Sequence, residues 1–380
     1  MATAINLLRK YGQSFWYDNI ERNMLQNGKL AQMIREDDLR GITSNPSIFE
    51  KAINGSKDYD DSLARLALEQ PSLNSRDYFY QLAVEDIKHA ADLLAHVYKE
   101  SHGEDGYVSI EVSPDLAYNT SATIKEAREL FKRIDRPNVM IKVPATWEGV
   151  PAVEQLIADG ININATLLFS VDRYIEIAHA YIAGLQKRKE SGQAIDKIAS
   201  VASFFVSRVD NILEKLVDEL PSDVSKTLAS LRGQIGILNA KCAYVEYGKL
   251  FGNSFKDLAK SGARPQRLLW ASTGVKNPDW SDVLYIDSLI GAHTVNTIPP
   301  ATLDAFKDHG TATQATLEMG LKDAPAEFHA LQNAGIDVKK AMQKLEDDGV
   351  ASFTDAFKKL LGAIDDKMSQ IKNRQSSSAA

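Results

Sequence analysis

The chain has 380 residues, of which 44 are Lys or Arg and 51 are Asp or Glu, which gives a formal net charge of −7. Hydrophobic residues make up 44% and charged residues 25%, the profile of a soluble globular protein with a large core. The mild acidity and the absence of a basic block argue against a nucleic-acid-binding protein, because binding to phosphates needs a cationic surface.

Other classes of protein are excluded by what the sequence lacks. The only cysteine, Cys242, cannot form an intrachain disulfide, which fits a reducing cytoplasm. No apolar run reaches the roughly 18 residues of a membrane span, and the apolar stretch at the N-terminus is too short for a signal peptide. The seven histidines include no pair with the spacing of a helix-borne zinc site. We therefore expect a cytoplasmic protein with no contact to membranes and no metal.

Short segments rich in β-branched and aromatic residues recur along the chain and predict buried parallel strands, because most are apolar throughout. Amphipathic helical segments lie between them, and Ser170 is placed to cap one of these helices. Eight strands that alternate with helices predict an α/β fold, a (β/α)8 TIM barrel. A doubly wound open sheet is the rival, but no Gly-x-Gly-x-x-Gly turn follows the first strand. The predicted strands are Ser14–Asp18, Gly41–Asn45, Tyr107–Ser113, Asn138–Pro144, Asn162–Phe169, Ala199–Val206, Arg267–Thr273 and Thr294–Ile298.

The chain is expected to form one structural domain. Residues 1–310 are predicted to form the barrel, 311–374 a helical C-terminal extension packed on its outside, and 375–380 a flexible tail. Helical insertions are expected after the second and sixth strands. The second insertion, residues 209–266, is a candidate to set the oligomeric state, with a homodimer as the expectation. In the extension, apolar residues from Phe353 to Ile371 form one stripe that Ser352 is placed to cap.

Polar residues occupy positions where a barrel interior is expected. Alternate residues of a barrel strand point inward, and active sites form at the carboxyl ends of the strands. In the fourth strand, Val139, Ile141 and Val143 form the face that suits the surrounding helices, so Lys142 points inward. The first two strands end in polar residues, and the same alternation directs others inward at matching depth, which gives the layer Asp18, Asn45, Glu111, Lys142, Asn164, Thr166 and Ser203.

An unpaired polar group buried away from water costs roughly 2–7 kcal/mol, so a whole layer of such groups indicates function. For any single member, a satisfied interior salt-bridge network is the simpler interpretation. The alternation also predicts that Ser203 and Phe205 share a face. It predicts that Leu167 packs outward and that Ser272 points inward with Trp270.

This layer suits carbonyl chemistry, because an amine in a water-poor pocket is a nucleophile toward a ketone. Attack gives a carbinolamine, and loss of water gives an iminium, which withdraws electrons from the adjacent C–C bond as it breaks. Glu111 and Asp18 lie on separate strands and offer the acid and the base that these steps need. Neutral donors and acceptors suited to sugar hydroxyls lie on other strands: Asn45, Asn164 and Ser203.

Two basic residues follow the sixth and seventh strands. Arg208 is expected in the first turn of a helix, a position that favours anions. Lys276 lies in a loop in which Gly274 lets backbone amides approach a phosphate. Either residue alone is readily interpreted as a surface cation, but together they favour a phosphate-binding site above Lys142.

Five segments resemble signature segments of the transaldolase family. They are Phe15–Asp18, Gly41–Phe49, Ser109–Ser113, Asn138–Thr146 and Gly160–Ser170. Their order and spacing match from about Asn6 to about Gly310. The overall length and the helical extension are similar to the longer bacterial branch of the family.

The resemblance implies a transferase of the pentose phosphate pathway that needs no cofactor. It would move a dihydroxyacetone unit from sedoheptulose 7-phosphate to glyceraldehyde 3-phosphate, so its partners are phosphorylated ketoses and aldoses. The resemblance implies that Lys142 forms the Schiff base and that Asp18 takes the hydroxyl proton during C–C cleavage. It also implies that Glu111 and Thr166 hold a water that carries protons.

The resemblance assigns the remaining residues to substrate binding. The dihydroxyacetone unit would contact Asn45, Asn164, Ser203 and Phe205, and the phosphate would contact Arg208, Ser272 and Lys276. The family carries an arginine in the loop after the seventh strand, where this chain has Lys276. A lysine offers a point charge in place of a bidentate fork, so this residue departs from the family pattern.

Three other functions stay open from the sequence. A Schiff-base fructose 6-phosphate aldolase would release free dihydroxyacetone instead of transferring it. A metal-dependent aldolase or isomerase would need clustered His and carboxylate ligands at the strand ends, where no histidine is expected. A non-catalytic sugar-phosphate-binding protein would use the Phe353–Ile371 stripe for interaction and would not need Lys142.

Overall fold

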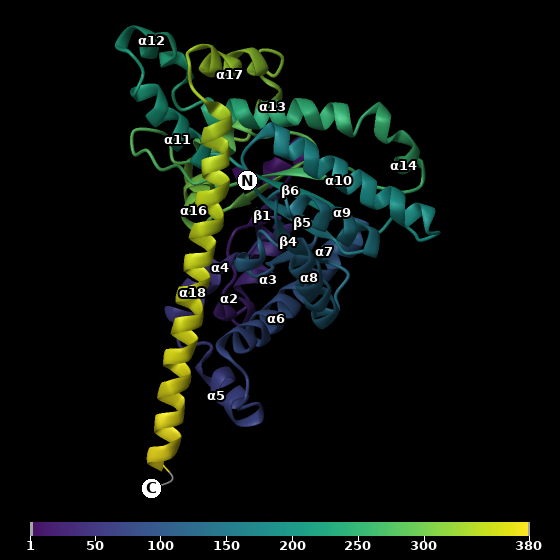
Figure 1. Ribbon diagram of the computed structural model, residues 1–380, viewed down its shortest axis with the longest axis vertical. Helices are drawn as coiled ribbons and strands as arrows, with labels where there is room; N and C mark the ends of the chain where they lie inside the picture. Colours follow the sequence, from purple (N-terminus) through teal and green to yellow (C-terminus); the bar gives the residue numbers. More distant parts are fainter. Residues whose placement is uncertain (1–2, 379–380) are drawn as a thin grey trace.

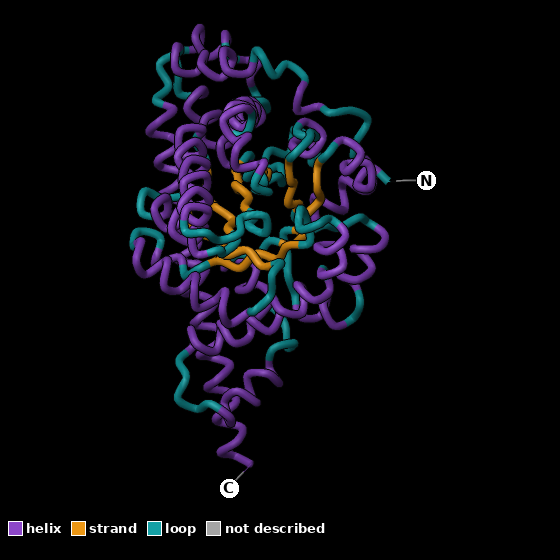
Figure 2. The backbone as a smooth tube through the Cα atoms, turned by 90° about the vertical axis from the view of Figure 1, so that its right-hand side faces the viewer, coloured by secondary structure: helices purple, strands orange, loops and turns teal. Residues whose placement is uncertain are grey.

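Eight parallel strands close into a barrel in sequence order, as the alternating pattern predicts. The structure is a computed structural model that describes residues 3–378, without the side chains of residues 372 and 374–378. Figure 2 shows the strands as a ring inside a shell of helices. The strands are β1 Gln13–Tyr17, β2 Gly41–Ile42, β3 Tyr107–Glu111, β4 Val139–Pro144, β5 Ile163–Leu168, β6 Ser200–Phe205, β7 Arg267–Ala271 and β8 Thr294–Ile298.

The barrel closes between β1 and β8, which pair from Gln13 with Thr294 to Tyr17 with Ile298. The short strand β2 bridges β1 and β3 through Gly41 and Ile42. A side chain at Gly41 would lie 2.5 Å from the ring of Trp16, so only glycine permits this close approach.

Helices connect the strands on the outside of the barrel, and none of those described is long and apolar enough to span a membrane. Before β3 they are α1 Ala4–Leu7, α2 Arg22–Gln26, α3 Lys29–Glu36, α4 Pro46–Asn54, α5 Asp60–Glu69, α6 Ser75–Leu93 and α7 Ala95–Glu100. Between β3 and β7 they are α8 Thr120–Ile134, α9 Gly149–Asp159, α10 Val171–Glu190, α11 Ser207–Asp218, α12 Ser222–Thr227, α13 Ile235–Leu250 and α14 Lys256–Lys260. After β7 the helices are α15 Leu284–Ser288, α16 Pro300–His309, α17 Ala324–Asn333 and α18 Val338–Ser378.

The two expected insertions are helical. Helices α4 to α7 lie between β2 and β3, and α11 to α14 lie between β6 and β7. The side chain of Ser170 accepts a hydrogen bond from the backbone N–H of Arg173, so it caps α10 as predicted.

The C-terminal extension ends in α18, which runs along the length of the molecule (Figure 1). The helix begins at Val338, so the prediction that Ser352 caps it is wrong. The reason is that Met342 and Leu345, one and two turns into the helix, are buried and extend the apolar face toward the N-terminus. Helix α18 continues to Ser378 into the predicted tail, whose last two residues lie outside the described part of the chain.

Apolar residues form two clusters. One lies between the strands and the surrounding helices and includes Phe357 and Ile364 of α18. The other includes barrel-interior residues such as Trp16 and Met140 and continues to Phe353. The barrel and the extension therefore share their apolar cores.

The strand alternation fails at two of the predicted positions. Trp270 packs against Phe204 and donates a hydrogen bond to the carbonyl of Leu289, so it belongs to the outer layer and does not point inward with Ser272. Leu167 was expected to face outward but belongs to the interior cluster. The pairing of β5 with β6 is irregular here, and Leu167 has a φ of 60°, which reverses the direction of its side chain.

Candidate active site

The amine of Lys142 lies inside the barrel at the carboxyl end of β4, and the residue is only 4% exposed. It donates a hydrogen bond of 3.2 Å to the carbonyl of Ser44 and lies 3.5 Å from Oε2 of Glu111. Lys142 pairs with Glu111 on β3 and with Asn164 on β5, so the barrel register brings three predicted residues together. The inward orientation predicted for Lys142 is confirmed.

Glu111 is the acidic neighbour of this amine. Burial raises its pKa to about 7, although the positive charge of Lys142 opposes the shift. Neither of its carboxylate oxygens has a hydrogen-bond partner among the described residues, and the same holds for the buried hydroxyl of Thr166. Thr166 pairs with Pro144 at the end of β4, close to Lys142 in the register. These oxygens therefore have unused hydrogen-bonding capacity beside Lys142.

Asp18 follows β1 and provides the second carboxylate of the site. Its Oδ1 accepts a hydrogen bond of 2.7 Å from the hydroxyl of Thr43, which is also 2.6 Å from the hydroxyl of Thr297. Burial raises the pKa of Asp18, and the charge of Lys142 and the hydrogen bond from Thr43 partly offset this effect. The two carboxylates thus have different surroundings, which suits different roles in proton transfer.

A chain of neutral polar groups extends from the lysine across β5 and β6. Ser203 donates a hydrogen bond of 2.6 Å to Oδ1 of Asn164, whose amide donates one of 3.1 Å to Ser109. Asn45 lies on the other side of the cavity, where its side chain accepts a hydrogen bond from the backbone N–H of Ile48 and caps α4. Its amide nitrogen is left to bind other groups.

Two cations lie at the rim. Arg208 is in the first turn of α11, as predicted, and its guanidinium lies 5.3 Å from the ring centroid of Phe205. Burial lowers the pKa of Arg208. Neither Arg208 nor Lys276 has a side-chain hydrogen bond or ion pair among the described residues. The ring of Phe205 is the aromatic contact of Arg208. Ser272 reaches the rim through a backbone with a φ of 56°, beyond the end of β7.

These residues surround one cavity of about 740 Å³ at the mouth of the barrel. The predicted residues that line it are Asp18, Asn45, Lys142, Ser203, Phe205, Arg208, Ser272 and Lys276. Glu111, Asn164 and Thr166 lie behind this lining and adjoin it through Lys142 and Ser203. The described residues contain no group of three or more His, Cys, Asp or Glu placed to hold a metal ion.

Comparison with known proteins agrees with this geometry. The model of the transaldolase/fructose-6-phosphate aldolase family matches residues 15–364. The chain belongs to this family. A transaldolase of Thiobacillus denitrificans is 46% identical over 356 residues, which cover 93% of this chain and 98% of the relative. Transaldolases of Trichodesmium erythraeum and Mycobacterium tuberculosis are 43% and 44% identical and cover 96% and 92% of this chain, and 97% and 93% of the relatives.

The cavity of this family member is also lined by residues that were not predicted, among them Phe353 and Lys51. Phe353 of α18 lies with its ring centroid 5.8 Å from the amine of Lys142. Lys51 of α4 adds a third cation, and its side chain has no hydrogen bond or ion pair among the described residues. Lys51 lies in α4, directly after the signature segment Gly41–Phe49, so its closeness to the site could be inferred from the sequence. The position of Phe353 depends on how α18 packs, which the sequence does not reveal.

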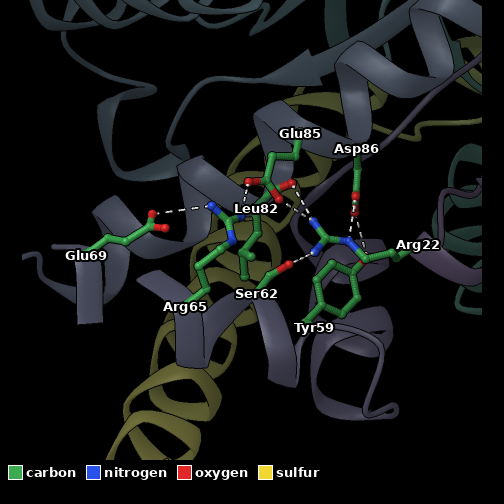
Figure 3. A network of polar contacts seen from close by, with 8 residues as sticks. All are labelled: Arg22, Tyr59, Ser62, Arg65, Glu69, Leu82, Glu85 and Asp86. Atoms are coloured by element: carbon green, nitrogen blue, oxygen red, sulfur yellow. Dashed lines mark hydrogen bonds and ion pairs between the residues drawn. The ribbon is translucent and has the colours of Figure 1, made fainter. Parts of the chain in front are cut away.

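A buried ion pair supports one wall of the cavity (Figure 3). Tyr59 lines the cavity, and its hydroxyl donates a hydrogen bond of 2.9 Å to Asp86. Arg22 donates a hydrogen bond of 2.8 Å to the other oxygen of Asp86, and its guanidinium lies 4.5 Å from the ring centroid of Tyr59. The pair therefore fixes the position of a residue that faces the substrate cavity.

Proposed function

We propose that this protein is a transaldolase of the pentose phosphate pathway. It transfers a dihydroxyacetone unit from sedoheptulose 7-phosphate to glyceraldehyde 3-phosphate and yields erythrose 4-phosphate and fructose 6-phosphate. The observation that carries this proposal is the buried amine of Lys142, 3.5 Å from Glu111, inside a cavity with unpaired cations at its rim. Membership of the family and the identity to named transaldolases support it.

The first step is attack of the Lys142 amine on the keto carbon of the donor. The carbinolamine loses its hydroxyl as water when an acid gives it a proton, and the C=N bond forms. With a pKa of about 7, Glu111 exists in both protonation states near neutral pH, so it can accept a proton from the amine and return it to the departing hydroxyl. The free hydroxyl of Thr166 suits a role in holding the water that carries these protons.

The second step is cleavage of the C–C bond. Asp18 accepts the proton of the hydroxyl on the carbon β to the iminium carbon, the bond between the α and β carbons breaks with its electrons moving toward the iminium nitrogen, and an aldehyde leaves. The lysine-bound enamine then attacks the acceptor aldehyde, and Asp18 returns the proton. Water adds to the iminium carbon of the new ketose, and the C–N bond breaks to release the product and free Lys142. The Thr43 hydrogen bond holds the Asp18 carboxylate in place for both transfers.

Substrate binding is divided between the interior and the rim. Asn45, Asn164 and Ser203 offer amide and hydroxyl groups to the dihydroxyacetone unit, and Phe205 provides an apolar wall. Arg208, Ser272 and Lys276 bind the phosphate at the rim of the cavity. The two cations have no ion-pair partner among the described residues, and the hydroxyl of Ser272, which lies 2.9 Å from the hydroxyl of Ser207, has capacity for a further hydrogen bond. We also propose a cytoplasmic location, which agrees with the single cysteine, and a homodimer.

The test of this function is reduction with borohydride in the presence of fructose 6-phosphate, followed by mass mapping. We expect the added mass of the three-carbon unit on the peptide that contains Lys142. Lys142→Met is expected to lose transfer activity by several orders of magnitude, and excess chelator is expected to leave wild-type activity unchanged. Trapping on another lysine, or full activity of Lys142→Met, would overturn the proposal.

Product analysis distinguishes transfer from simple aldol cleavage, because the family includes fructose-6-phosphate aldolases as well as transaldolases. With fructose 6-phosphate alone, a transaldolase releases little free dihydroxyacetone, whereas an aldolase releases it at the rate of donor consumption. Addition of erythrose 4-phosphate is expected to restore rapid turnover of the donor. A turnover rate that does not depend on the acceptor would identify an aldolase.

A further inference from the structure

The C-terminal helix contributes an aromatic side chain to the active-site cavity. Phe353 lies in α18, outside the eight βα units, and is only 4% exposed. Its ring centroid is 5.8 Å from the amine of Lys142, and it lines the same cavity as Asp18 and Ser203. The ring face therefore lies near the reacting nitrogen inside the cavity.

Leu167 at the end of β5 and Gly349 on α18 permit this close approach. Gly349 lies one turn before Phe353, and a Cβ at this position would lie 3.0 Å from a methyl group of Leu167. Leu167 points toward α18 because of its left-handed backbone, described above. Any larger residue at this position would push Leu167 away by a few tenths of an ångström, so glycine lets α18 lie close against the end of β5.

The helix is also held by contacts that follow Phe353 along α18. Phe357 packs edge-on against Phe79 of α6, with ring centroids 5.6 Å apart. Further along, Lys367 donates hydrogen bonds to the carbonyl of Ser56, at 2.9 Å, and to the carboxylate of Asp60. Ser56 lines the cavity, so α18 is held by contacts both before Phe353, at Leu167, and after it, at Ser56. Phe353 is thus a fixed part of the site.

We propose that Phe353 is a positioning residue that keeps water from the carbon of the lysine-bound enamine, slows its protonation and thereby favours transfer over release. This inference rests on the proposed Schiff-base function. Release of free dihydroxyacetone requires the enamine carbon to take up a proton. Water then adds its oxygen to the iminium carbon, and the C–N bond breaks to free the amine. The proton uptake is the step that only release requires. An apolar ring beside the nitrogen limits the access of water that would deliver this proton to the enamine carbon, while an acceptor aldehyde reaches the enamine from the rim.

The experiment compares Phe353→Ala and Phe353→Leu with the wild type. The measured quantity is the ratio of free dihydroxyacetone released to three-carbon units transferred, with fructose 6-phosphate as donor and erythrose 4-phosphate as acceptor. We expect Phe353→Ala to raise this ratio at least tenfold. Phe353→Leu restores an apolar cover and is expected to stay within threefold of the wild type. An unchanged ratio in Phe353→Ala would overturn the inference.

A matched control separates this effect from a general loosening of α18. Ile364 is fully buried on the same helix but does not line the cavity, so Ile364→Ala removes packing elsewhere. We expect it to lower the unfolding midpoint without changing the ratio. An equal rise of the ratio in Ile364→Ala would also overturn the inference. Borohydride trapping on Lys142 of the wild type tests the proposed function separately, because trapping does not depend on the ratio of released to transferred dihydroxyacetone.

Discussion

The amine of Lys142 lies 3.5 Å from Oε2 of Glu111, and both side chains are almost completely buried. Burial raises the pKa of Glu111 to about 7, so this carboxyl group changes its protonation state near neutral pH. A group with this property can act as base and acid in successive steps without a large free-energy penalty for either state. The pH dependence of the reaction therefore reports on this pair.

We expect the kcat/KM of the wild type to fall as the pH decreases through about 7. Below this pH Glu111 is protonated and no longer accepts a proton from the attacking amine. Glu111→Gln removes the titrating group, so its profile is expected to lack this inflection, with activity lower by about 10²–10⁴-fold. Steady-state kinetics between pH 5 and 9 measure both effects. If the inflection near 7 persists in Glu111→Gln, another group is responsible for it.

The hydrogen bond from Thr43 to Asp18 leads to a second prediction. Loss of a hydrogen bond to a charged group costs about 1.5–3 kcal/mol, so Thr43→Val is expected to lower kcat by about ten- to a hundredfold. Without this donor the pKa of Asp18 rises further, which leaves less of the carboxylate form. Thr43→Ser keeps the hydroxyl and is expected to retain activity within about threefold of wild type. Cleavage rates with fructose 6-phosphate measure this effect, and equal rates for the Val and Ser variants would contradict it.

Most of the barrel and the floor of the site could be predicted from the sequence, because the alternation along a strand is a local property. Ile110 and Val112 pack in the outer cluster, as do Val139, Ile141 and Val143, and this leaves Glu111 and Lys142 in the interior. The alternation failed where a left-handed residue interrupts a strand or follows it. Leu167 and Ser272 both have positive φ, and the surrounding tertiary structure imposes this conformation on residues that do not prefer it.

The role of α18 could not be predicted for a different reason. Its apolar stripe shows that one face is buried but not which element it packs against. Phe353 reaches Lys142 only because α18 lies across the barrel mouth, and this contact joins residues more than two hundred positions apart. Gly349 does not reveal this contact in the sequence, because α18 also contains Gly362, where an added Cβ would meet nothing within 4 Å.

The three cations around the cavity lead to a third prediction. Arg208, Lys51 and Lys276 have no ion-pair partner among the described residues, so their charges are available to a phosphate. We expect Arg208→Ala to raise the KM for sedoheptulose 7-phosphate by at least tenfold, and Lys51→Ala and Lys276→Ala to raise it less, because both lysines are exposed to solvent. Steady-state kinetics with the phosphorylated donor measure these changes.

Lys57 is the matched control for Lys51. It is an exposed lysine that follows α4 but does not line the cavity. Lys57→Ala is expected to leave the KM unchanged within experimental error. An equal effect of Lys51→Ala and Lys57→Ala would indicate attraction by the overall charge of this surface and would contradict a direct contact of Lys51 with phosphate.

The buried pair of Arg22 and Asp86 leads to the last prediction (Figure 3). Burial raises the pKa of Asp86, and Arg22 and Tyr59 oppose this effect, so removal of Arg22 leaves a carboxyl group buried without its cation. We expect Arg22→Ala to lower the free energy of unfolding by about 3–5 kcal/mol. Arg65 bonds Glu85 in the same network but is half exposed, so Arg65→Ala is expected to cost less than about 1 kcal/mol. Urea unfolding measures the free energy of unfolding of both variants.

Because Tyr59 loses its support when Arg22 is removed, Arg22→Ala is also expected to raise the KM. An unchanged KM would show that the cavity wall does not depend on this pair.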